Sequence, residues 1–222
     1  MSLRPEADPP CDLPLARTRR HWLALAGRGL AGLAALASPR AWAGRQLEEP
    51  LADSVRSALS AAVAGSVPPV PEFSDETSRL RHARWLQAME ARLAPHLPDA
   101  LQRHDLLPTA WYEAARARLD VGLVLGLIQV ESGFRKHAVS PAGARGYMQV
   151  MPFWSRLIGD GDVARLFHLQ MNLRFGCVIL RHYLDRERGD VFMALGRYNG
   201  TRGQAAYPNA VLNAQRLWAW PG

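Results

Sequence analysis

Apolar positions recur at helical spacing in several stretches of this chain. Over residues 75–97, Trp85, Met89 and Leu93 lie near the 3.6-residue period of an amphipathic helix. Asp75 lies at the start of this stretch, where a negative charge stabilises a helix N-terminus. The pattern therefore predicts a helix with one apolar face and one polar face.

Similar patterns continue along the chain and are separated by short loops that contain Gly or Pro. We expect further helices over residues 109–119, 121–132, 169–187, 190–199 and 207–220. An earlier helical segment follows residue 44 and stops before the Pro-rich stretch 68–71, which we interpret as a linker. The sequence contains no convincing alternating strand and no internal repeat, so the predicted fold class is mainly α.

Residues 1–43 have the pattern of an export signal. Basic residues precede an apolar stretch over about 22–37, and the sequence Ala-Trp-Ala at 41–43 is a cleavage pattern. We expect cleavage after Ala43 and a periplasmic mature protein without a stable membrane span, because the stretch is short and interrupted. The paired arginines at 19–20 resemble a twin-arginine signal, so the Sec and twin-arginine routes both stay open.

Composition and charge narrow the classes of partner. The 222 residues, 48% of them hydrophobic, are enough to bury one core, and the formal net charge is +7. The basic residues are almost all Arg, Lys136 is the only lysine, and no basic run is interleaved with aromatic residues as single-strand binding requires. We therefore expect no nucleic acid among the partners.

The two cysteines do not predict a disulfide. Cys11 falls within the export signal, which leaves Cys177 without a partner in the mature chain. Cys177 shares helical spacing with Leu173 and Leu180, so we expect a buried thiol that packs in the core.

Glu131 is the first candidate for chemistry, because it ends the apolar run 121–130. The seven histidines form no His-Glu-x-x-His pattern, and no close Cys/His cluster is present, so we expect no metal. The sequence also lacks a Gly-x-Ser-x-Gly elbow and a phosphate-binding glycine loop, so we expect no cofactor. Glycoside cleavage by carboxylic acids remains.

The acidic residues after Glu131 are distributed in a way that favours a single catalytic carboxylate. Paired-carboxylate glycosidases place two acids about 5–10 Å apart, but no Asp or Glu occurs over residues 132–159. Asp160 and Asp162 lie in a Gly-rich stretch that predicts an exposed turn. A second acid could still come from the helix-end charges at Asp185, Glu187 and Asp190.

One carboxylic acid is sufficient if the N-acetyl group of the sugar acts as the internal nucleophile. Glu131 would then donate a proton to the glycosidic oxygen, and its apolar helix would raise its pKa towards the working pH by desolvation. The alternative is a structural Glu131 that ends the helix or pairs with Arg135 or Arg145. The residues alone leave both interpretations open.

Four separated motifs then resemble a known family. They are ESGFRKHAVSPAGARGYMQVMP from residue 131, NLRFGCVILRHYL from residue 172, ALGRYNG from residue 194 and YPNAV from residue 207. In this order they resemble the soluble-type lytic transglycosylases, which are related to goose-type lysozyme, over about 120–218. The resemblance implies a lysozyme-like, mainly helical fold. We expect this catalytic domain to span 106–222 and to follow a helical N-terminal extension over 44–105, which matches no accessory module.

The resemblance also implies an activity. Such enzymes cleave the MurNAc-GlcNAc β-1,4 bond of peptidoglycan without water and leave 1,6-anhydro-N-acetylmuramic acid ends. The sole catalytic acid of the family falls on Glu131, which would act first as an acid and then as a base. Ser140 would orient this carboxylate or hold the N-acetyl group, although a turn residue that bonds backbone is the alternative at this position.

Four further positions are implied to bind substrate. Gln149 would bond sugar or backbone at the floor of the site, and Met148 would pack beside it, with simple core packing as the alternative. Tyr198 and Asn199 match a Tyr-Asn pair of the family, and a phenol close to Glu131 could align the carboxylate. The alternative for this pair is an ordinary helix end before a glycine.

Three functions therefore compete at this point. The first is a lytic transglycosylase whose partner is the glycan strand of peptidoglycan. The second is a hydrolase of the same fold, a lysozyme or a chitin-cleaving enzyme, that uses a second acid. The third is a noncatalytic wall-binding or assembly protein that keeps the fold for glycan recognition.

Overall fold

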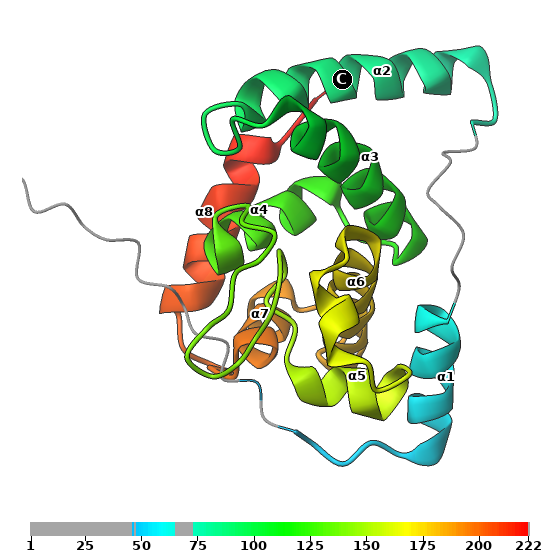
Figure 1. The fold of residues 1–222 in the computed structure, drawn as a ribbon, viewed down its shortest axis with the longest axis vertical. Coiled ribbons are helices and arrows are strands. Elements are labelled where there is room, and N and C mark those ends of the chain that lie inside the picture. Colours follow the sequence, from blue (N-terminus) through cyan, green and yellow to red (C-terminus); the bar gives the residue numbers. More distant parts are fainter. Residues whose placement is uncertain (1–45, 47, 65–72, 222) are drawn as a thin grey trace, which may run out of the picture. The chain divides into compact units, whose positions relative to one another are not determined.

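The computed structural model describes residue 46, residues 48–64 and residues 73–221 (Figure 1). The export signal predicted over 1–43 and the Pro-rich linker predicted over 68–71 lie outside these residues. The elements are α1 Asp53–Val63, α2 Glu76–Leu93, α3 Ala100–Arg116, α4 Val121–Ser132, α5 Pro152–Ile158, the 3-10 helix η1 Val163–Phe167, α6 Leu169–Arg186, α7 Val191–Asn199 and α8 Ala206–Trp218. The described part contains isolated bridges but no strand, which confirms the mainly α fold class.

Aspartate occupies the N-cap position of several of these helices. A carboxylate at the N-cap accepts a hydrogen bond from a backbone N–H of the first turn and so stabilises the start of the helix. The caps of this kind are Asp75 at α2, Asp99 at α3, Asp120 at α4, Asp162 at η1 and Asp190 at α7. The acidic start predicted for the helix at 75–97 is therefore confirmed, and the same device recurs along the chain.

The prediction of a helix over 109–119 was wrong at both ends. Helix α3 begins at Ala100, because Asp99 accepts hydrogen bonds from the first-turn amides, and it continues through Pro108. It ends at Arg116, and Arg118 then takes a left-handed φ of 53°. Helix α3 therefore runs across position 105, where the sequence analysis places the end of the N-terminal extension.

Two short elements were not predicted from the sequence. Helix α5 begins with Pro152 at its first position, where the missing N–H costs nothing, and η1 follows the cap at Asp162. Both elements are too short to display a hydrophobic period. The helices predicted over 121–132, 169–187, 190–199 and 207–220 are confirmed as α4, α6, α7 and α8.

Helix α4 is the buried centre of the described structure. It lies between α3 and α8 and contacts both (Figure 1). Gly126 permits the close approach of α8, since a Cβ at this position would lie only 2.6 Å from the backbone nitrogen of Gln215 and 3.1 Å from the carbonyl oxygen of Val211. A glycine one turn earlier, Gly122, faces the carbonyl group of Trp218 in the same way. The start of α4 therefore meets the end of α8, and the end of α4 lies near the start of α8.

Helix α1 packs on α5 and α6 through its buried residues Leu59 and Val63. The residues before it are held as well, because the indole Nε1 of Trp154 donates a hydrogen bond of 2.8 Å to Gln46. Glu49 forms ion pairs with Arg186 and Arg197. No helix among the described residues has the length and apolar character that crossing a membrane requires.

Candidate active site

Glu131 lies in the last turn of α4 and is 5% exposed. The phenol of Tyr207, in the first turn of α8, donates a hydrogen bond of 2.5 Å to its Oε1 atom. The Oε2 atom is buried and has no hydrogen-bond partner among the described residues. The carboxyl group therefore has one oxygen fixed by protein and a second oxygen that the described protein groups leave unused.

Burial changes the acidity of this carboxyl group. Desolvation raises the pKa of Glu131 to about 8, and the hydrogen bond from Tyr207 acts in the opposite direction. No charged side chain of the described residues is among the causes of the shift. Glu131 is therefore mostly protonated at neutral pH, in agreement with the expectation from its apolar helix, and it is not paired with Arg135 or Arg145.

Tyr198 lies close to the same carboxyl group but bonds elsewhere. Its phenol donates a hydrogen bond of 2.8 Å to the carbonyl oxygen of Met148. Burial raises the pKa of Tyr198 well above its usual value, and the nearby charge of Glu131 raises it further. The phenol that aligns Glu131 is thus Tyr207, whereas Tyr198 fixes the loop beside it.

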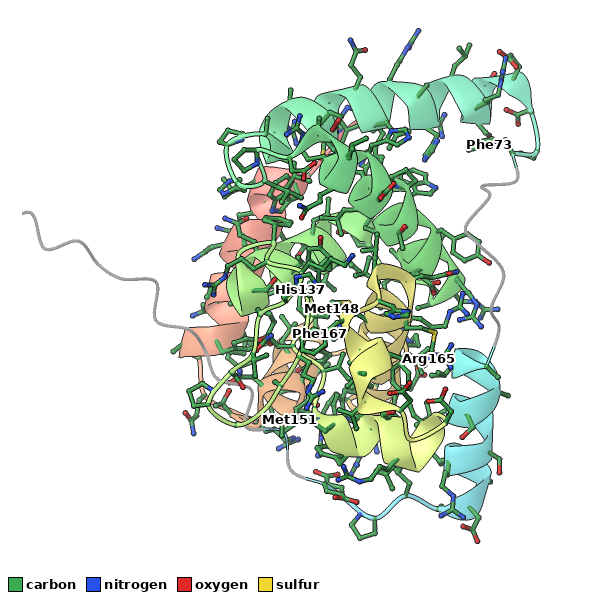
Figure 2. All side chains as sticks on the ribbon, viewed as in Figure 1. Phe73, His137, Met148, Met151, Arg165 and Phe167 are labelled. Atoms are coloured by element: carbon green, nitrogen blue, oxygen red, sulfur yellow. The ribbon has the colours of Figure 1, made fainter. Side chains whose placement is uncertain are left out.

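Met148 belongs to that loop and is fully buried (Figure 2). Its side chain packs against Gly176 of α6, where a Cβ would collide with the Met148 sulfur. The side chain of Met148 therefore does what the core-packing alternative predicts, and its carbonyl oxygen links the loop to Tyr198.

Ser140 and Gln149 hold the two sides of the loop between α4 and α5. The Oγ atom of Ser140 accepts a hydrogen bond of 3.1 Å from the backbone N–H of Ala144. The amide Nε2 of Gln149 donates to the carbonyl oxygens of Ala138, at 3.1 Å, and Gly146, at 2.9 Å. Both side chains are buried, and the hydrogen bonds described for them go to loop backbone rather than to Glu131.

Asn172 also holds this loop, a role that was not predicted from the sequence. From α6 its Nδ2 donates to the carbonyl oxygens of Arg145, at 2.8 Å, and Leu166, at 2.7 Å, while its Oδ1 accepts from the N–H of Met148 at 2.8 Å. The side chain is 1% exposed. Asn172 is the first residue of the motif NLRFGCVILRHYL, which contributes to the family resemblance. The motif was recognised in the sequence, but the role of Asn172 in holding the loop was not.

Asn199 ends α7, and Gly200 follows it with a left-handed φ of 81°. Its Oδ1 accepts a hydrogen bond of 3.2 Å from the hydroxyl of Thr201. Its Nδ2 is buried and has no partner among the described residues. Asn199 thus lies at an ordinary helix end before a glycine, as the alternative interpretation expects. Its amide nitrogen donates no hydrogen bond to the described residues.

The first candidates for a second acid are engaged in local structure. Asp160 and Asp162 are exposed and lie in a bend, as the Gly-rich sequence predicted. Asp160 forms an ion pair with Arg165, a residue that Figure 2 labels, and Asp162 caps η1. Neither residue takes part in the hydrogen bonds around Glu131.

The later acids are also engaged away from Glu131. Asp185 pairs with Arg181 at 2.6 Å, and Asp190 caps α7. Glu187 accepts hydrogen bonds from Arg197 and Arg202, which lower its pKa to about 2. These acids are charged groups of the α6–α7 connection.

Tyr207 is the functional candidate that the sequence analysis missed. The motif YPNAV was recognised, but no role was given to its tyrosine, which lies 76 positions from Glu131. Burial and the charge of Glu131 raise the pKa of the Tyr207 phenol well above its usual value, so it remains a hydrogen-bond donor. The adjacent Pro208 lies in the first turn of α8, and a proline near a helix start was the signal available in the sequence.

The remaining features of the described residues give no competing chemistry. A hollow of about 810 Å³ between α1, α3 and α6 is larger than the other described hollows, but Glu131 does not line it. No group of three His, Cys, Asp or Glu side chains in this part of the chain could hold a metal ion. Cys177 is buried as predicted, and burial raises its pKa well above the usual value, which makes the thiol unreactive.

The fold and the buried acid together define a class of protein. A mainly helical domain presents one buried, protonated carboxylic acid at the end of its central helix, and a loop held by three polar side chains lies beside it. Residues 109–216 match the family described as "Transglycosylase SLT domain". This segment is just under half of the chain, and its match confirms the predicted family resemblance and the lysozyme-like domain.

Relatives with assigned names match the same part of the chain. A transglycosylase of Enterobacteria phage PRD1 is 35% identical over 114 residues, which are 46% of this chain and 42% of the relative. The membrane-bound lytic murein transglycosylase C of Actinobacillus pleuropneumoniae serotype 5b (strain L20) is 32% identical over 114 residues, 47% of this chain and 31% of the relative. The protein of that name from Haemophilus influenzae (strain PittEE) is 35% identical over 78 residues, 35% of this chain and 21% of the relative. The chain thus spans less than half the length of these relatives.

Proposed function

We propose that this protein is a peptidoglycan lytic transglycosylase that cleaves the MurNAc-GlcNAc β-1,4 bond and leaves 1,6-anhydro-N-acetylmuramic acid. The observation that carries the proposal is the buried carboxyl group of Glu131, whose pKa is raised to about 8 and whose Oε2 has no described protein partner. The match of residues 109–216 to the transglycosylase SLT domain family and the names of the relatives support it.

The first step uses the proton that burial retains on Glu131. This proton passes from the carboxyl group to the glycosidic oxygen as the bond between that oxygen and C1 of the muramic sugar breaks. The N-acetyl oxygen of the same sugar forms a bond to C1 and takes up the developing positive charge. The GlcNAc end leaves as an alcohol, and Glu131 is left as a carboxylate.

The second step restores the acid. The C6 hydroxyl of the muramic sugar attacks C1, the bond from the N-acetyl oxygen breaks, and the hydroxyl proton returns to Glu131. No water is consumed, and the enzyme regains its protonated form. A group that donates and then accepts one proton works best when its pKa lies near the working pH, which the pKa of about 8 satisfies.

The two buried tyrosines have different roles in this proposal. Tyr207 holds Oε1 of Glu131 at 2.5 Å and leaves Oε2 to exchange the proton. Tyr198 holds the carbonyl group of Met148 and so keeps the loop that carries Gln149 against the site. Ser140, Gln149 and Asn199 are proposed to bind the sugar through their remaining polar capacity.

A hydrolase of the same fold receives less support from the contacts. A hydrolase of the paired-carboxylate type uses a second carboxylate to activate water or to attack C1. The acids that follow Glu131 in the described chain cap helices or pair with arginines, and none contributes to the pKa shift of Glu131. The proposal also includes export to the periplasm by the signal predicted over 1–43, where peptidoglycan is found.

The test is mass spectrometry of the products released from purified peptidoglycan by the mature protein. Wild-type protein is expected to release muropeptides with anhydro ends, and Glu131→Gln is expected to lose about 10²–10⁴-fold in rate because it cannot donate a proton. The matched control is Asp185→Asn, which also changes an acid to its amide but lies in an exposed helix-end pair.

The outcomes separate the candidate functions. Anhydro ends that depend on Glu131 and persist in Asp185→Asn support the transglycosylase. Reducing ends indicate hydrolysis and would overturn the proposed product. Full activity in the Glu131→Gln variant would overturn the assigned acid, and retained binding without any product would favour a wall-binding protein.

A further inference from the structure

A second hollow, of about 440 Å³, lies on the loop that follows Glu131. Residues 135–139 line it from the loop, and Gln102 of α3 contributes the facing side. Three of its five loop residues are Arg135, Lys136 and His137, and Figure 2 labels His137 on this loop. Lys136 is the only lysine of the chain.

The backbone before the hollow turns the loop outwards. Gly133 and Phe134 both have positive φ angles, 57° and 62°. For Phe134 such a conformation costs about 1–3 kcal/mol, and the cost is offset because its ring is buried against Trp218 at 5.3 Å and His96 at 5.8 Å. With Phe134 fixed in the core, the next residues point away from it, and Arg135 and His137 are exposed.

The loop remains connected to the proposed proton donor. The Nε atom of Arg135 donates a hydrogen bond of 2.8 Å to the carbonyl oxygen of Ser132, the residue directly after Glu131. On the other side, the ring of His137 lies 5.9 Å from that of Phe167, over which the Arg145 guanidinium lies at 5.4 Å. A ligand in the hollow would therefore lie against the loop that directly follows Glu131.

The charge of the hollow is not neutralised by nearby acids. Arg135, Lys136 and His137 form no ion pair with the described residues, and no Asp or Glu occurs over residues 132–159. Asp99 and Asp105 each lie three positions from Gln102 in the chain. Asp99 caps α3 and also accepts a hydrogen bond from the Gln102 side chain at 2.9 Å, and Asp105 does not line the hollow. The hollow thus offers an unpaired positive field to an anion.

We infer that this hollow binds a carboxylate of the peptide attached to the muramic sugar, so that the enzyme prefers peptide-bearing glycan to bare glycan. The inference rests on the proposed function, because the peptide hangs from the same sugar whose C1 bond is cut. That sugar occupies the site of Glu131, and its substituent reaches the residues that follow Glu131 in the loop. Lys136 then acts as the specificity-determining residue.

The experiment compares two substrates made from one batch of sacculi, from which attached anionic polymers have first been extracted. One half keeps its peptides, and the other half is stripped of them by an amidase. Lys136→Glu is expected to lower the rate on peptide-bearing strands about threefold to tenfold and to leave the rate on bare strands unchanged. Arg84→Glu is the matched control, since it makes the same charge change at an exposed position of α2.

Cosedimentation provides a readout that does not need cleavage. In the Glu131→Gln background, adding Lys136→Glu should weaken binding to intact sacculi and leave binding to stripped sacculi unchanged. The lone lysine also permits a direct measurement, because peptide-bearing fragments should protect Lys136 from acetylation more than bare fragments do.

The outcomes keep the two proposals apart. Equal effects of Lys136→Glu on both substrates, or equal effects of Lys136→Glu and Arg84→Glu, would overturn the carboxylate site and leave the proposed function standing. If binding depends on Lys136 with unextracted sacculi but no longer does so once the attached polymers are extracted, the hollow binds those polymers and the carboxylate site is overturned. Absence of cleavage by the wild type, with Lys136-dependent binding intact, would contradict the proposed function and support the site.

Discussion

Two buried glutamates on neighbouring helices have opposite surroundings. Glu113 of α3 is 1% exposed and is held by Arg174 of α6, which is equally buried, through hydrogen bonds of 2.8 and 3.1 Å to Oε1. Glu131 of α4 is 5% exposed and receives one hydrogen bond, from the neutral phenol of Tyr207. One carboxylate faces a permanent positive charge, and the other carboxyl group faces none.

The difference shows that burial alone does not assign a role to an acid. A buried carboxylate beside a guanidinium is a structural ion pair, which is costly to break because its partner remains behind as an isolated charge. A buried carboxyl group beside a neutral donor keeps its proton instead. The pairing, rather than the depth of burial, separates the structural glutamate from the candidate catalytic one.

The largest effect on stability should come from Glu113→Gln. This change leaves the buried Arg174 charge without a counter-ion, so we expect the free energy of unfolding to fall by about 3–5 kcal/mol. Urea denaturation followed by circular dichroism measures it. The double variant Glu113→Leu/Arg174→Met removes both charges and should recover most of the loss; if it does not, the ion pair is not the source of the effect.

The next effect concerns Glu131 and depends on pH. Its pKa is about 8 in the folded protein and near 4.5 in the unfolded chain, so the folded state binds the extra proton between these values. The free energy of unfolding should therefore fall as pH rises from about 4.5 to 8 and then level off. Glu131→Gln lacks this decline and should be more stable than the wild type by about 2–5 kcal/mol at pH 9, with little difference at pH 4.

Thermal unfolding across this pH range measures that difference. If the difference in stability between the wild type and Glu131→Gln stays constant from pH 4 to 9, the pKa of Glu131 is not raised. In that case the contrast with Glu113 would disappear.

The smallest effect separates the two tyrosines. Tyr207→Phe removes the hydrogen bond that lowers the pKa of Glu131, so the pH at which cleavage declines should move upwards, with a loss of about 1–2 kcal/mol in stability. Tyr198→Phe removes a similar buried hydrogen bond, to the Met148 carbonyl group, and should cost similar stability without moving the pH profile. Equal profiles for the two variants would argue against Tyr207 as the residue that positions Glu131.

The sequence was a good guide where one helix determined the answer. The apolar run 121–130 predicted α4, the position of Glu131 near its end and the raised pKa of Glu131, because the run is buried on nearly every side. The end of α7 at Asn199 was also visible from the glycine that follows it. By contrast, the first half of α3 was not predicted. A proline such as Pro108 usually indicates a helix boundary in a sequence, but α3 continues through it.

Contacts between distant segments were not predictable in the same way. The hydrogen bond between Tyr207 and Glu131 depends on how closely α8 approaches α4. Gly126 permits this approach, and a glycine within an apolar run does not indicate in sequence which helix will pack against it. The three hydrogen bonds of Asn172 depend on the path of the loop over α6. Polar residues of this kind look like ordinary helix residues until the packing is known.

The close approach of α4 and α8 at Gly126 has a consequence for the making of the protein. Glu131 leaves the ribosome 76 positions before the tyrosine that holds it, and the surroundings that retain its proton form only when α8 has packed. A growing or partly folded chain therefore exposes an ordinary water-solvated glutamate with an ordinary acidity. Under the proposed function, the nascent chain cannot damage a cell wall, because wall-cutting chemistry begins only after the helices close on one another.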